Sequence, residues 1–277
     1  MTVTALLPVK DYHPAHLHAA LGSMFAQTSP DWRLLIVVEA DGVAAVRREL
    51  APHLDDPRVE LIANEGRQLS GAFNTGMRHA QTDFVAILLG DDMWSPDAAA
   101  VLERNIRERP EVDFFHSALR TLAPDGGRHV RPSPTTLGPD DFVRGAVKHL
   151  LCWRRSKALS FGGMDESLNS VGPDDFDFPW SMADHGARFG AIPECLYLYR
   201  DHRDSFRLTT HLPRSVHAAE LRRIMRKHGT GRVATELHVL VARRTYLRQC
   251  LYRSPLDRRL RQRLGLGPRP AWYEELP

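Results

Sequence analysis

Two groups of aspartates have the residue types and spacing for chemistry: the adjacent pair Asp91 and Asp92, and the later cluster Asp174, Asp175 and Asp177. Adjacent carboxylates suit a divalent cation that also binds phosphate oxygens. A crowded carboxylate can act as a general base, because neighbouring negative charge raises its pKa toward neutrality. Each group also has a simpler interpretation, in which the pair shapes a turn and the cluster marks a helix N-terminus, where acids are favourable.

The local sequence places the first pair at the end of a strand. Residues Phe84–Leu89 are all apolar and rich in Val, Ile and Leu, which is typical of a strand buried on both faces. Further on, Ser95-Pro96-Asp97 predicts a new helix with a serine N-cap and a proline in its first turn. Both acids are therefore expected at the carboxyl edge of a parallel sheet, where open α/β sheets bind ligands.

Apolar runs and helical patterns alternate before and after this stretch. We expect strands at 3–8, 32–39, 59–62 and 84–89, separated by helices at 16–25, 43–50 and 70–79. This alternation predicts an α/β fold with a doubly wound, mostly parallel sheet flanked by helices. Later elements are expected at 98–107, 112–118, 150–155, 174–186, 189–192 and 196–200, followed by a helical, basic region from residue 213 onward.

Length and composition favour a soluble globular protein. The chain has 277 residues, of which 43% are hydrophobic and 26% charged. It contains no apolar run of about eighteen residues, so no membrane-spanning helix is expected. The first residues read as a strand rather than a signal peptide. Three cysteines far apart in sequence favour neither a disulfide framework nor a zinc site, which predicts a cytoplasmic location.

The net charge of +3 hides a strong asymmetry. Residues 1–202 carry 20 basic and 28 acidic side chains, net −8, whereas residues 203–277 carry 17 basic and 6 acidic ones, net +11. Such a basic C-terminal region predicts an interaction of its own, with anionic lipid or nucleic acid as the first candidates. The alternative is that its helices pack on the acidic part of the chain or on a second subunit.

Eight short segments are informative through their order and spacing. They are residues 3–9, 21–28, 36–39, 64–76, 89–97, 162–166, 174–177 and 199–202. For example, Gly162–Glu166 matches the pattern G-G-f-D-E, and Tyr199–His202 matches Y-R-x-H. Together the segments resemble glycosyltransferase family 2, the inverting nucleotide-sugar transferases of GT-A fold, over roughly residues 2–205.

The resemblance implies a transferase that moves a sugar from a nucleoside-diphosphate donor, UDP- or dTDP-linked, to an acceptor hydroxyl. It implies a Mg²⁺ or Mn²⁺ ion held by Asp91, with Asp92 beside it and His202 as a further ligand. Asp175 would be the base, with Asp174 next to it in the catalytic pair. The implied donor-binding residues are Pro8, Val9, Asp11, Glu39, Asn64, Gly66, Asn74, Gly90, Asp91 and Gly163.

Several of these residues could instead have roles that involve no ligand. Glu39 could be a strand-end acid facing solvent, His202 a surface loop histidine, and Asn64 and Asn74 polar scaffold rather than ligand contacts. Asp174 and Asp177 are expected to crowd Asp175 with like charge, which would raise the pKa of the Asp175 carboxyl and favour its role as a base.

The sequence departs from the family pattern at three positions. Leu89 stands where the first acid of D-x-D is usual, Phe73 where an arginine near the phosphates is usual, and Asp174 in place of a glutamate. Arg67 and Arg78 are the nearest candidates to replace the missing arginine. These departures keep open a catalytically degenerate, sugar-nucleotide-binding relative.

A nucleotidyltransferase is a weaker alternative, because residues 8–14 lack the Gly-rich, basic phosphate loop that such enzymes use. We expect a transferase domain at 1–205 and a helical extension at 206–277. The acceptor is open: a glycan, a lipid-linked sugar or a natural product. We expect no nucleic-acid partner, and an extension that closes the acceptor side or builds a homodimer. Peripheral membrane contact is less favoured, because residues 208–269 contain no Trp or Phe.

Overall fold

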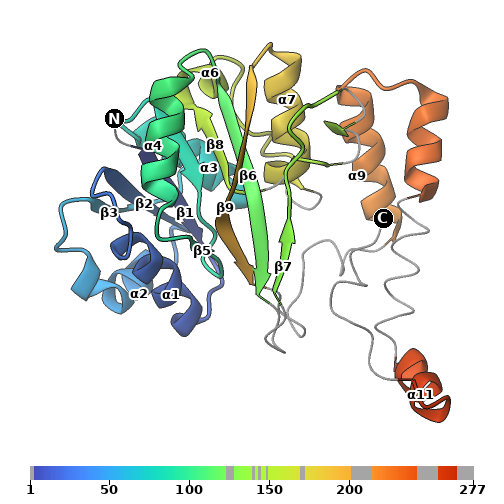
Figure 1. The fold of residues 1–277 in the computed structure, drawn as a ribbon, viewed down its shortest axis with the longest axis horizontal. Helices are drawn as coiled ribbons and strands as arrows, with labels where there is room; N and C mark the ends of the chain where they lie inside the picture. The colour runs from blue at the N-terminus through green and yellow to red at the C-terminus, as the bar shows by residue number, and fades with distance from the viewer. Residues whose placement is uncertain are drawn as a thin grey trace.

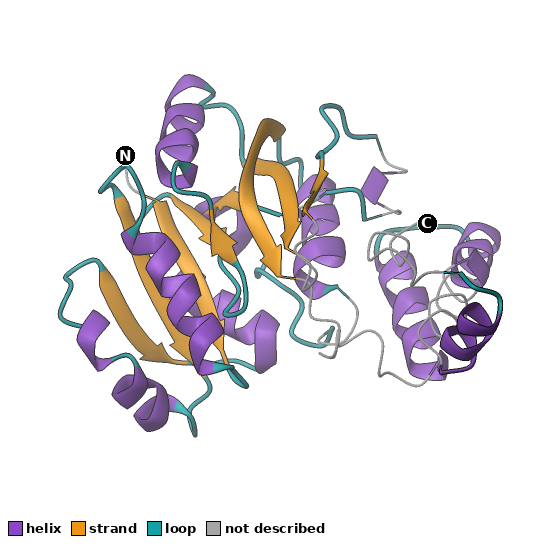
Figure 2. Ribbon diagram, turned by 60° about the horizontal axis from the view of Figure 1, so that its bottom comes forward, coloured by secondary structure: helices purple, strands orange, loops and turns teal. Residues whose placement is uncertain are grey.

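The predicted strands and helices form one mixed sheet with helices on both faces (Figures 1 and 2). In this computed structural model, residues 3–122, 128–138, 141–142, 145–147, 149–168, 172–200, 214–241 and 255–266 are described. Within them the sheet has nine strands in the order β3-β2-β1-β4-β8-β6-β9-β5, and β7 pairs with β6 outside this path.

The N-terminal half alternates as the sequence predicts. Its strands are β1 (Val3–Val9), β2 (Trp32–Val38), β3 (Val59–Ala63), β4 (Phe84–Ile87) and β5 (Met93–Trp94). Its helices are α1 (Pro14–Phe25), α2 (Val43–Glu49), the 3-10 turn η1 (Ala51–His53), α3 (Gln68–His79) and α4 (Ala98–Glu108).

The C-terminal half is less regular. Its strands are β6 (Phe114–Leu122), β7 (Arg128–Arg131), β8 (Leu151–Arg154) and β9 (Phe189–Arg200). Its helices are α6 (Arg155–Leu159), the π-helical turn η2 (Pro173–Asp177), α7 (Phe178–Asp184), α9 (Arg214–Lys227) and α11 (Pro255–Arg263). Residues 232–241 are also helical.

Continuous apolar strands arise here because both faces of the sheet are covered. Along β1, Ala5 and Leu7 belong to one buried cluster while Leu6 belongs to the other, and β2 alternates in the same way. Strands β3, β2, β1 and β4 pair in parallel, as expected for strands joined by helices. Their carboxyl ends therefore lie at one edge of the sheet, where the candidate residues follow.

Beyond β4 the sheet differs from the mostly parallel expectation. β8 inserts between β4 and β6 and is antiparallel to both, whereas β6 and β9 are parallel. The two short strands expected at 189–192 and 196–200 form one strand, β9, with a register shift opposite Ser117–Leu119. The bulge keeps the pairing continuous across the residues that looked like a break.

Two predictions about helix starts need correction. Helix α4 begins at Ala98, as the expected range 98–107 has it, but Pro96 precedes the helix and Ser95 Oγ donates to Asp97 Oδ1 at 2.7 Å instead of capping the helix. The helix expected from Asp174 begins instead as the π-helical turn η2, and α7 follows only from Phe178.

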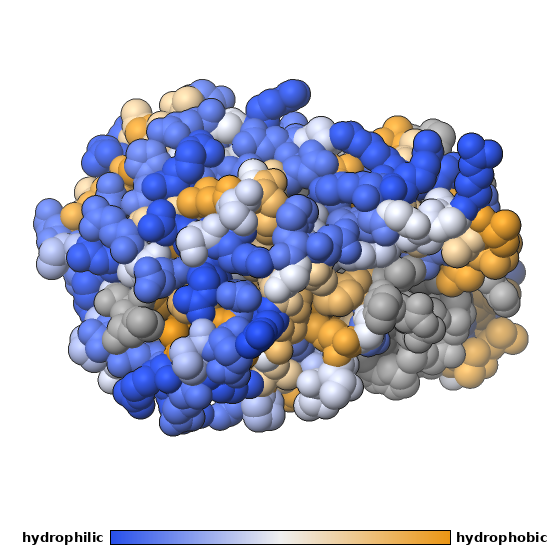
Figure 3. All heavy atoms as spheres, turned by 90° about the horizontal axis from the view of Figure 1, so that it is seen from above, coloured by the Kyte–Doolittle hydropathy of each residue, from blue (hydrophilic) through white to orange (hydrophobic). Residues whose placement is uncertain are grey.

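The basic C-terminal region contributes to the core of the sheet. Ala218, Leu221 and Met225 of α9 are buried in the same apolar cluster as Phe73 and Trp153. Large apolar side chains also remain exposed on the later helices, and Figure 3 shows apolar patches toward this end of the molecule. The boundary expected at 205/206 lies outside the described residues. In the part of the chain that is described, no helix is both long and apolar enough to span a membrane.

Candidate active site

The first aspartate pair lies in a tight turn that leaves β4. Leu88 still follows the sheet, since its amide donates to Leu6 O at 3.0 Å, and Asp92 N then closes the turn onto Leu89 O at 3.1 Å. Gly90 and Asp91 occupy the turn and are partly exposed, whereas Asp92 is fully buried. The pair therefore sits at the sheet edge that the sequence predicts.

Asp92 anchors this turn to strand β9. The amide of Arg200 donates to Asp92 Oδ1 at 2.8 Å, and Arg200 Nε donates to the backbone oxygen of Asp91 at 2.9 Å. Burial raises the pKa of Asp92 well above its ordinary value, with the charge of Asp91 as the next cause. The two carboxylates are therefore not equivalent. Asp91 is the more exposed acid, and Asp92 is positioned for a structural role.

The second aspartate pair occupies η2. Asp174 is buried, and loss of hydration raises its pKa to about 7, with the negative charge of Asp175 as the second cause. Asp175 is only partly buried and so is the more accessible carboxylate of the two. Asp177, the third acid, is bound by basic side chains of α9, and its charge is not among the causes that raise the pKa of Asp174. The expectation that Asp177 crowds Asp175 with like charge stays a prediction.

Two residues that the sequence analysis missed link the two aspartate pairs. The phenol oxygen of Tyr197, on β9, accepts a hydrogen bond from Leu89 N at 3.1 Å in the first turn. The Tyr197 ring lies 5.3 Å from the ring of His149, centroid to centroid. His149 Nε2 in turn lies 3.9 Å from Asp174 Oδ2. A buried path of side chains thus joins the Asp91 turn to the acid pair.

The sequence carries little signal for these two residues. Tyr197 lies in an apolar strand, where an aromatic residue is ordinarily read as core. His149 precedes β8 without any motif around it. Only the insertion of β8 between β4 and β6 brings His149 near β9, and such long-range pairing is not readable from local pattern.

The residues expected to contact the nucleoside gather at the ends of three adjacent strands. Glu39, after β2, receives a hydrogen bond from Asn64 Nδ2 at 3.1 Å, and its own amide donates to Val9 O at 3.1 Å. Asn64, which follows β3, is itself buried. Pro8 and Val9 close β1, and the exposed Asp11 lies just beyond. The arrangement brings these five residues to one edge of the sheet.

Asn74 and Gly163 form a close-packed scaffold. The side-chain amide of Asn74 donates to Met164 O and to Glu166 Oε1, both at 2.9 Å, and its oxygen accepts from Met164 N at 2.8 Å. Gly163 has φ +78°, and a Cβ atom there would collide with Asn74 Oδ1. For Asn74 the polar-scaffold interpretation is the one that these contacts favour.

Gly66 is close-packed in a similar way, since a Cβ would lie 2.6 Å from Gly71 Cα. Its amide donates to Asn64 Oδ1 at 2.9 Å, which fixes the turn after β3. Phe73 is fully buried in the apolar core, and Arg78 forms an exposed ion pair with Glu65 at 3.0 Å. The amide of Arg67 binds Glu166 Oε2 at 2.9 Å.

The residues present fit a cation that takes few protein ligands. Asp91 offers one partly exposed carboxylate, which suits Mg²⁺ or Mn²⁺ when phosphate and water supply the other oxygens. Among the described residues, no group of three or more His, Cys, Asp or Glu side chains is arranged around a metal position. His202, the further ligand expected from the sequence, lies outside the described residues.

Comparison with known proteins relates this chain to glycosyltransferases. The model of the family described as glycosyl transferase family 2 matches residues 4–138. The O-antigen biosynthesis protein RfbC of Myxococcus xanthus is 29% identical over 207 residues, which cover 72% of this chain. The match covers 16% of RfbC, so the chain spans only a small part of that relative.

Solved structures share the fold at low sequence identity. TarS of S. aureus, in complex with UDP-GlcNAc, matches with a TM-score of 0.64 and 14% identity over 81% of this chain and 65% of that one. The mannosyltransferase PcManGT of Pyrobaculum calidifontis, in complex with GDP-Man and Mn²⁺, matches with a TM-score of 0.56 and 22% identity, over 81% and 63% of the two chains. The expected GT-A fold is therefore confirmed, and residues 4–138 of this chain are a glycosyl transferase family 2 domain.

Proposed function

We propose that this protein is an inverting glycosyltransferase that moves a sugar from a nucleoside-diphosphate donor to an acceptor hydroxyl. One observation carries the proposal: Tyr197 and His149 join the Asp91 turn to the Asp174–Asp175 pair within a GT-A fold. The bound UDP-GlcNAc and GDP-Man of the structural neighbours support a sugar nucleotide as donor. A UDP- or dTDP-linked sugar is our first candidate.

In this proposal Asp91 binds a divalent cation together with the donor diphosphate. When bound, the cation neutralises charge that develops on the leaving diphosphate. Arg200 holds the backbone of Asp91, and Asp92 locks the turn to β9, so the Asp91 carboxylate needs little reorganisation. Mn²⁺ in the mannosyltransferase neighbour supports this choice of ion.

Asp175 is the proposed base. Its carboxylate accepts the proton of the acceptor hydroxyl while that oxygen forms the new bond to the anomeric carbon. The bond from this carbon to the diphosphate oxygen breaks at the same time, and attack from the opposite face inverts the centre. Asp174, buried beside Asp175 with its pKa raised to about 7, limits how much negative charge the pair carries near neutral pH.

The donor nucleoside is proposed to lie at the ends of β1, β2 and β3. Glu39 has one carboxylate oxygen fixed by Asn64, which leaves the other for a base N–H or a ribose hydroxyl. Asp11 is exposed nearby and is proposed to assist. Gly66, Asn74 and Gly163 support the donor site through their close packing rather than through direct contact.

We propose a transferase domain at 1–205 and a helical extension at 206–277, with the acceptor bound between the catalytic edge and the extension. A glycan, a lipid-linked sugar or a natural product would fit as acceptor. We place the reaction in the cytoplasm, because the three cysteines show no disulfide pattern. A homodimer remains part of the proposal, and nucleic acid does not.

The experiment is turnover of a panel of sugar nucleotides by the full chain, with Mg²⁺, with Mn²⁺ and with EDTA. Release of nucleoside diphosphate that requires the metal and increases with an acceptor mixture is expected. Tight binding of a sugar nucleotide without any release under all conditions would instead favour a catalytically degenerate relative.

A further inference from the structure

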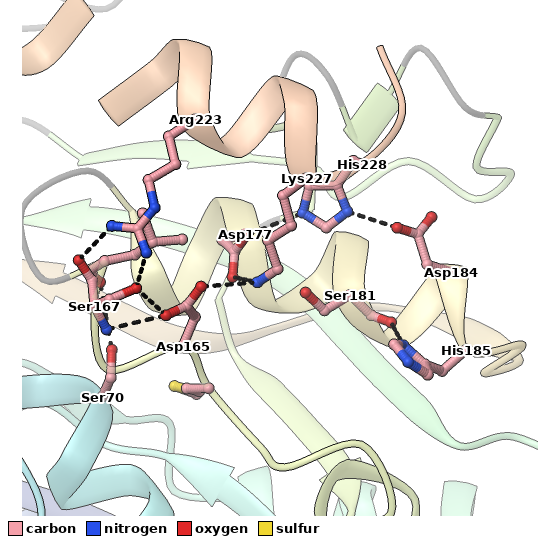
Figure 4. A network of polar contacts seen from close by, with 12 residues as sticks. Ser70, Asp165, Ser167, Asp177, Ser181, Asp184, His185, Arg223, Lys227 and His228 are labelled. Carbon is pink, nitrogen blue, oxygen red and sulfur yellow. Dashed lines mark hydrogen bonds and ion pairs between the residues drawn. The ribbon is translucent and has the colours of Figure 1, made fainter. Parts of the chain in front are cut away.

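Helix α9 reaches the proposed catalytic turn through two consecutive basic residues at its C-terminal end. Lys227 Nζ donates to Asp177 Oδ2 at 2.8 Å, and His228 Nε2 lies 3.0 Å from Asp177 Oδ1 (Figure 4). Both oxygens of Asp177 are therefore bound by the last residue of α9 and the residue that follows it. Asp177 is the last residue of η2, the turn that carries Asp174 and Asp175.

The Asp177 and His228 side chains that make these contacts are buried. The side chains of Asp177 and His228 are each 1% exposed, and that of Lys227 is 35% exposed. The His228 ring is stacked on Trp180 of α7, with centroids 4.3 Å apart and planes 9° from parallel. A buried carboxylate without a partner is costly, so removing either basic group destabilises this one position of Asp177.

Both ring nitrogens of His228 contact carboxylates. Its Nδ1 lies 2.6 Å from Asp184 Oδ2, and its Nε2 lies 3.0 Å from Asp177 Oδ1. His228 thus links the turn η2 to the end of α7, because Asp184 is the last residue of that helix.

Side chains of α9 also bind the segment after Gly163. Lys227 Nζ lies 3.4 Å from Asp165 Oδ2, and Arg223 donates to the backbone and hydroxyl oxygens of Ser167 (Figure 4). That segment is the one tied to Asn74 and so to α3. One face of α9 therefore fixes η2 relative to the scaffold of the donor side.

We propose that Lys227 and His228 are positioning residues for the base: they hold Asp177, and through it the turn η2, so that Asp175 points at the acceptor hydroxyl. On this account the C-terminal extension is part of the catalytic machinery. The inference rests on the proposed function for the role of Asp175. The contacts between α9 and η2 do not depend on it.

The kinetic test replaces Lys227 by Met, His228 by Ala, and Lys227 by Arg as the conservative rescue. Because misplacing a reacting group by about 1 Å costs up to about 100-fold, kcat is expected to fall about 10- to 100-fold in the first two variants. The KM for the donor is expected to change by less than about twofold, since α9 does not line the donor site in this account. Lys227→Arg is expected to retain most of the turnover.

Arg222→Met is the matched control. Arg222 lies on the same helix and forms a bidentate pair, with both distances 2.7 Å, with Glu236 of the helix 232–241 rather than with η2. It is expected to leave kcat unchanged. Wild-type kcat in Lys227→Met and His228→Ala, or an equal loss in Arg222→Met, would overturn the proposal.

A second measurement remains informative if the protein turns over no sugar nucleotide, or if Lys227→Met does not fold. Hydrogen–deuterium exchange of residues 172–184 is expected to rise in His228→Ala and in Lys227→Gln, and to stay unchanged in Arg222→Met. Faster exchange in these variants, together with a wild-type protein that turns over no sugar nucleotide, would reject the proposed function but support the contact of Lys227 and His228 with η2. Unchanged exchange in both variants would reject the proposal that these two residues hold η2, whatever the turnover.

Discussion

His149 Nε2 lies 3.9 Å from Asp174 Oδ2, and both side chains are buried next to the proposed base. The same histidine ring contacts Tyr197, whose hydroxyl binds the turn of Asp91. The contact therefore makes one connected unit of the two acidic motifs that the sequence presents separately. The predictions below test the parts of this unit, beginning with Asp174.

Asp174 is predicted to make stability pH-dependent. Its folded-state pKa is raised to about 7 from an ordinary 3.8, so the folded protein binds a proton that the unfolded chain has released between these values. Its contribution to the free energy of unfolding is therefore greatest at low pH and is lost as the pH rises from about 4 to about 7. Asp174→Asn cannot ionise and removes this loss.

Urea unfolding of wild type and Asp174→Asn at pH 5 and pH 8 measures the effect. The variant is expected to gain at least about 1 kcal/mol relative to wild type on going to the higher pH, since one pKa unit corresponds to about 1.4 kcal/mol. A difference that is the same at both pH values would show that Asp174 is ionised throughout.

Substitutions of Asp91 and of Asp92 are predicted to affect turnover to different extents. Asp91→Asn is expected to abolish metal-dependent turnover and to leave unfolding within about 0.5 kcal/mol of wild type, as for a partly exposed side chain. Asp92→Asn is expected to impair turnover less, because its remaining oxygen can still accept from Arg200 N. Calorimetric titration with UDP and Mn²⁺ separates the two, and EDTA-insensitive activity in Asp91→Asn would contradict this assignment.

Gly162 and Gly163 offer a matched pair for the donor-side scaffold. Both have positive φ, at +94° and +78°, but a Cβ at Gly162 meets no atom within 4 Å whereas one at Gly163 collides with Asn74. Gly162→Ala is expected to cost about 1 kcal/mol of backbone strain. Gly163→Ala adds displacement of Asn74 and is expected to cost a further 1–3 kcal/mol, roughly the range for overpacking. Equal losses in denaturant unfolding would remove the packing argument.

The sequence predicts the N-terminal half of the fold well, because β1, β2 and β4 are predominantly apolar and are buried on both faces over most of their length. The same local patterns could not predict that β8 enters between β4 and β6, since antiparallel pairing at that point joins residues distant in sequence. His149 and Tyr197 were missed for that reason.

Local pattern also misjudged the N-cap of α4 and the shape of η2. Ser95 bonds Asp97 rather than the helix amides, and the acids after Pro173 adopt a π-helical turn, which Gly172 at φ +50° enters. Asp177 is bound by Lys227 and His228, far along the chain, whereas Asp174 lies near His149. No local pattern around these acids indicates which of them is bound by a basic residue.

The central claim is that Asp175 acts as base in a transfer that inverts the anomeric centre. Asp175→Asn is expected to lower kcat about 10²- to 10⁴-fold, the usual contribution of a positioned base, with donor affinity nearly unchanged. The most direct measurement is the proton NMR coupling constant of the anomeric proton in the product, recorded early in the reaction with a donor of known configuration. We predict the opposite configuration to that of the donor, and a product that retains the configuration of the donor would contradict this account.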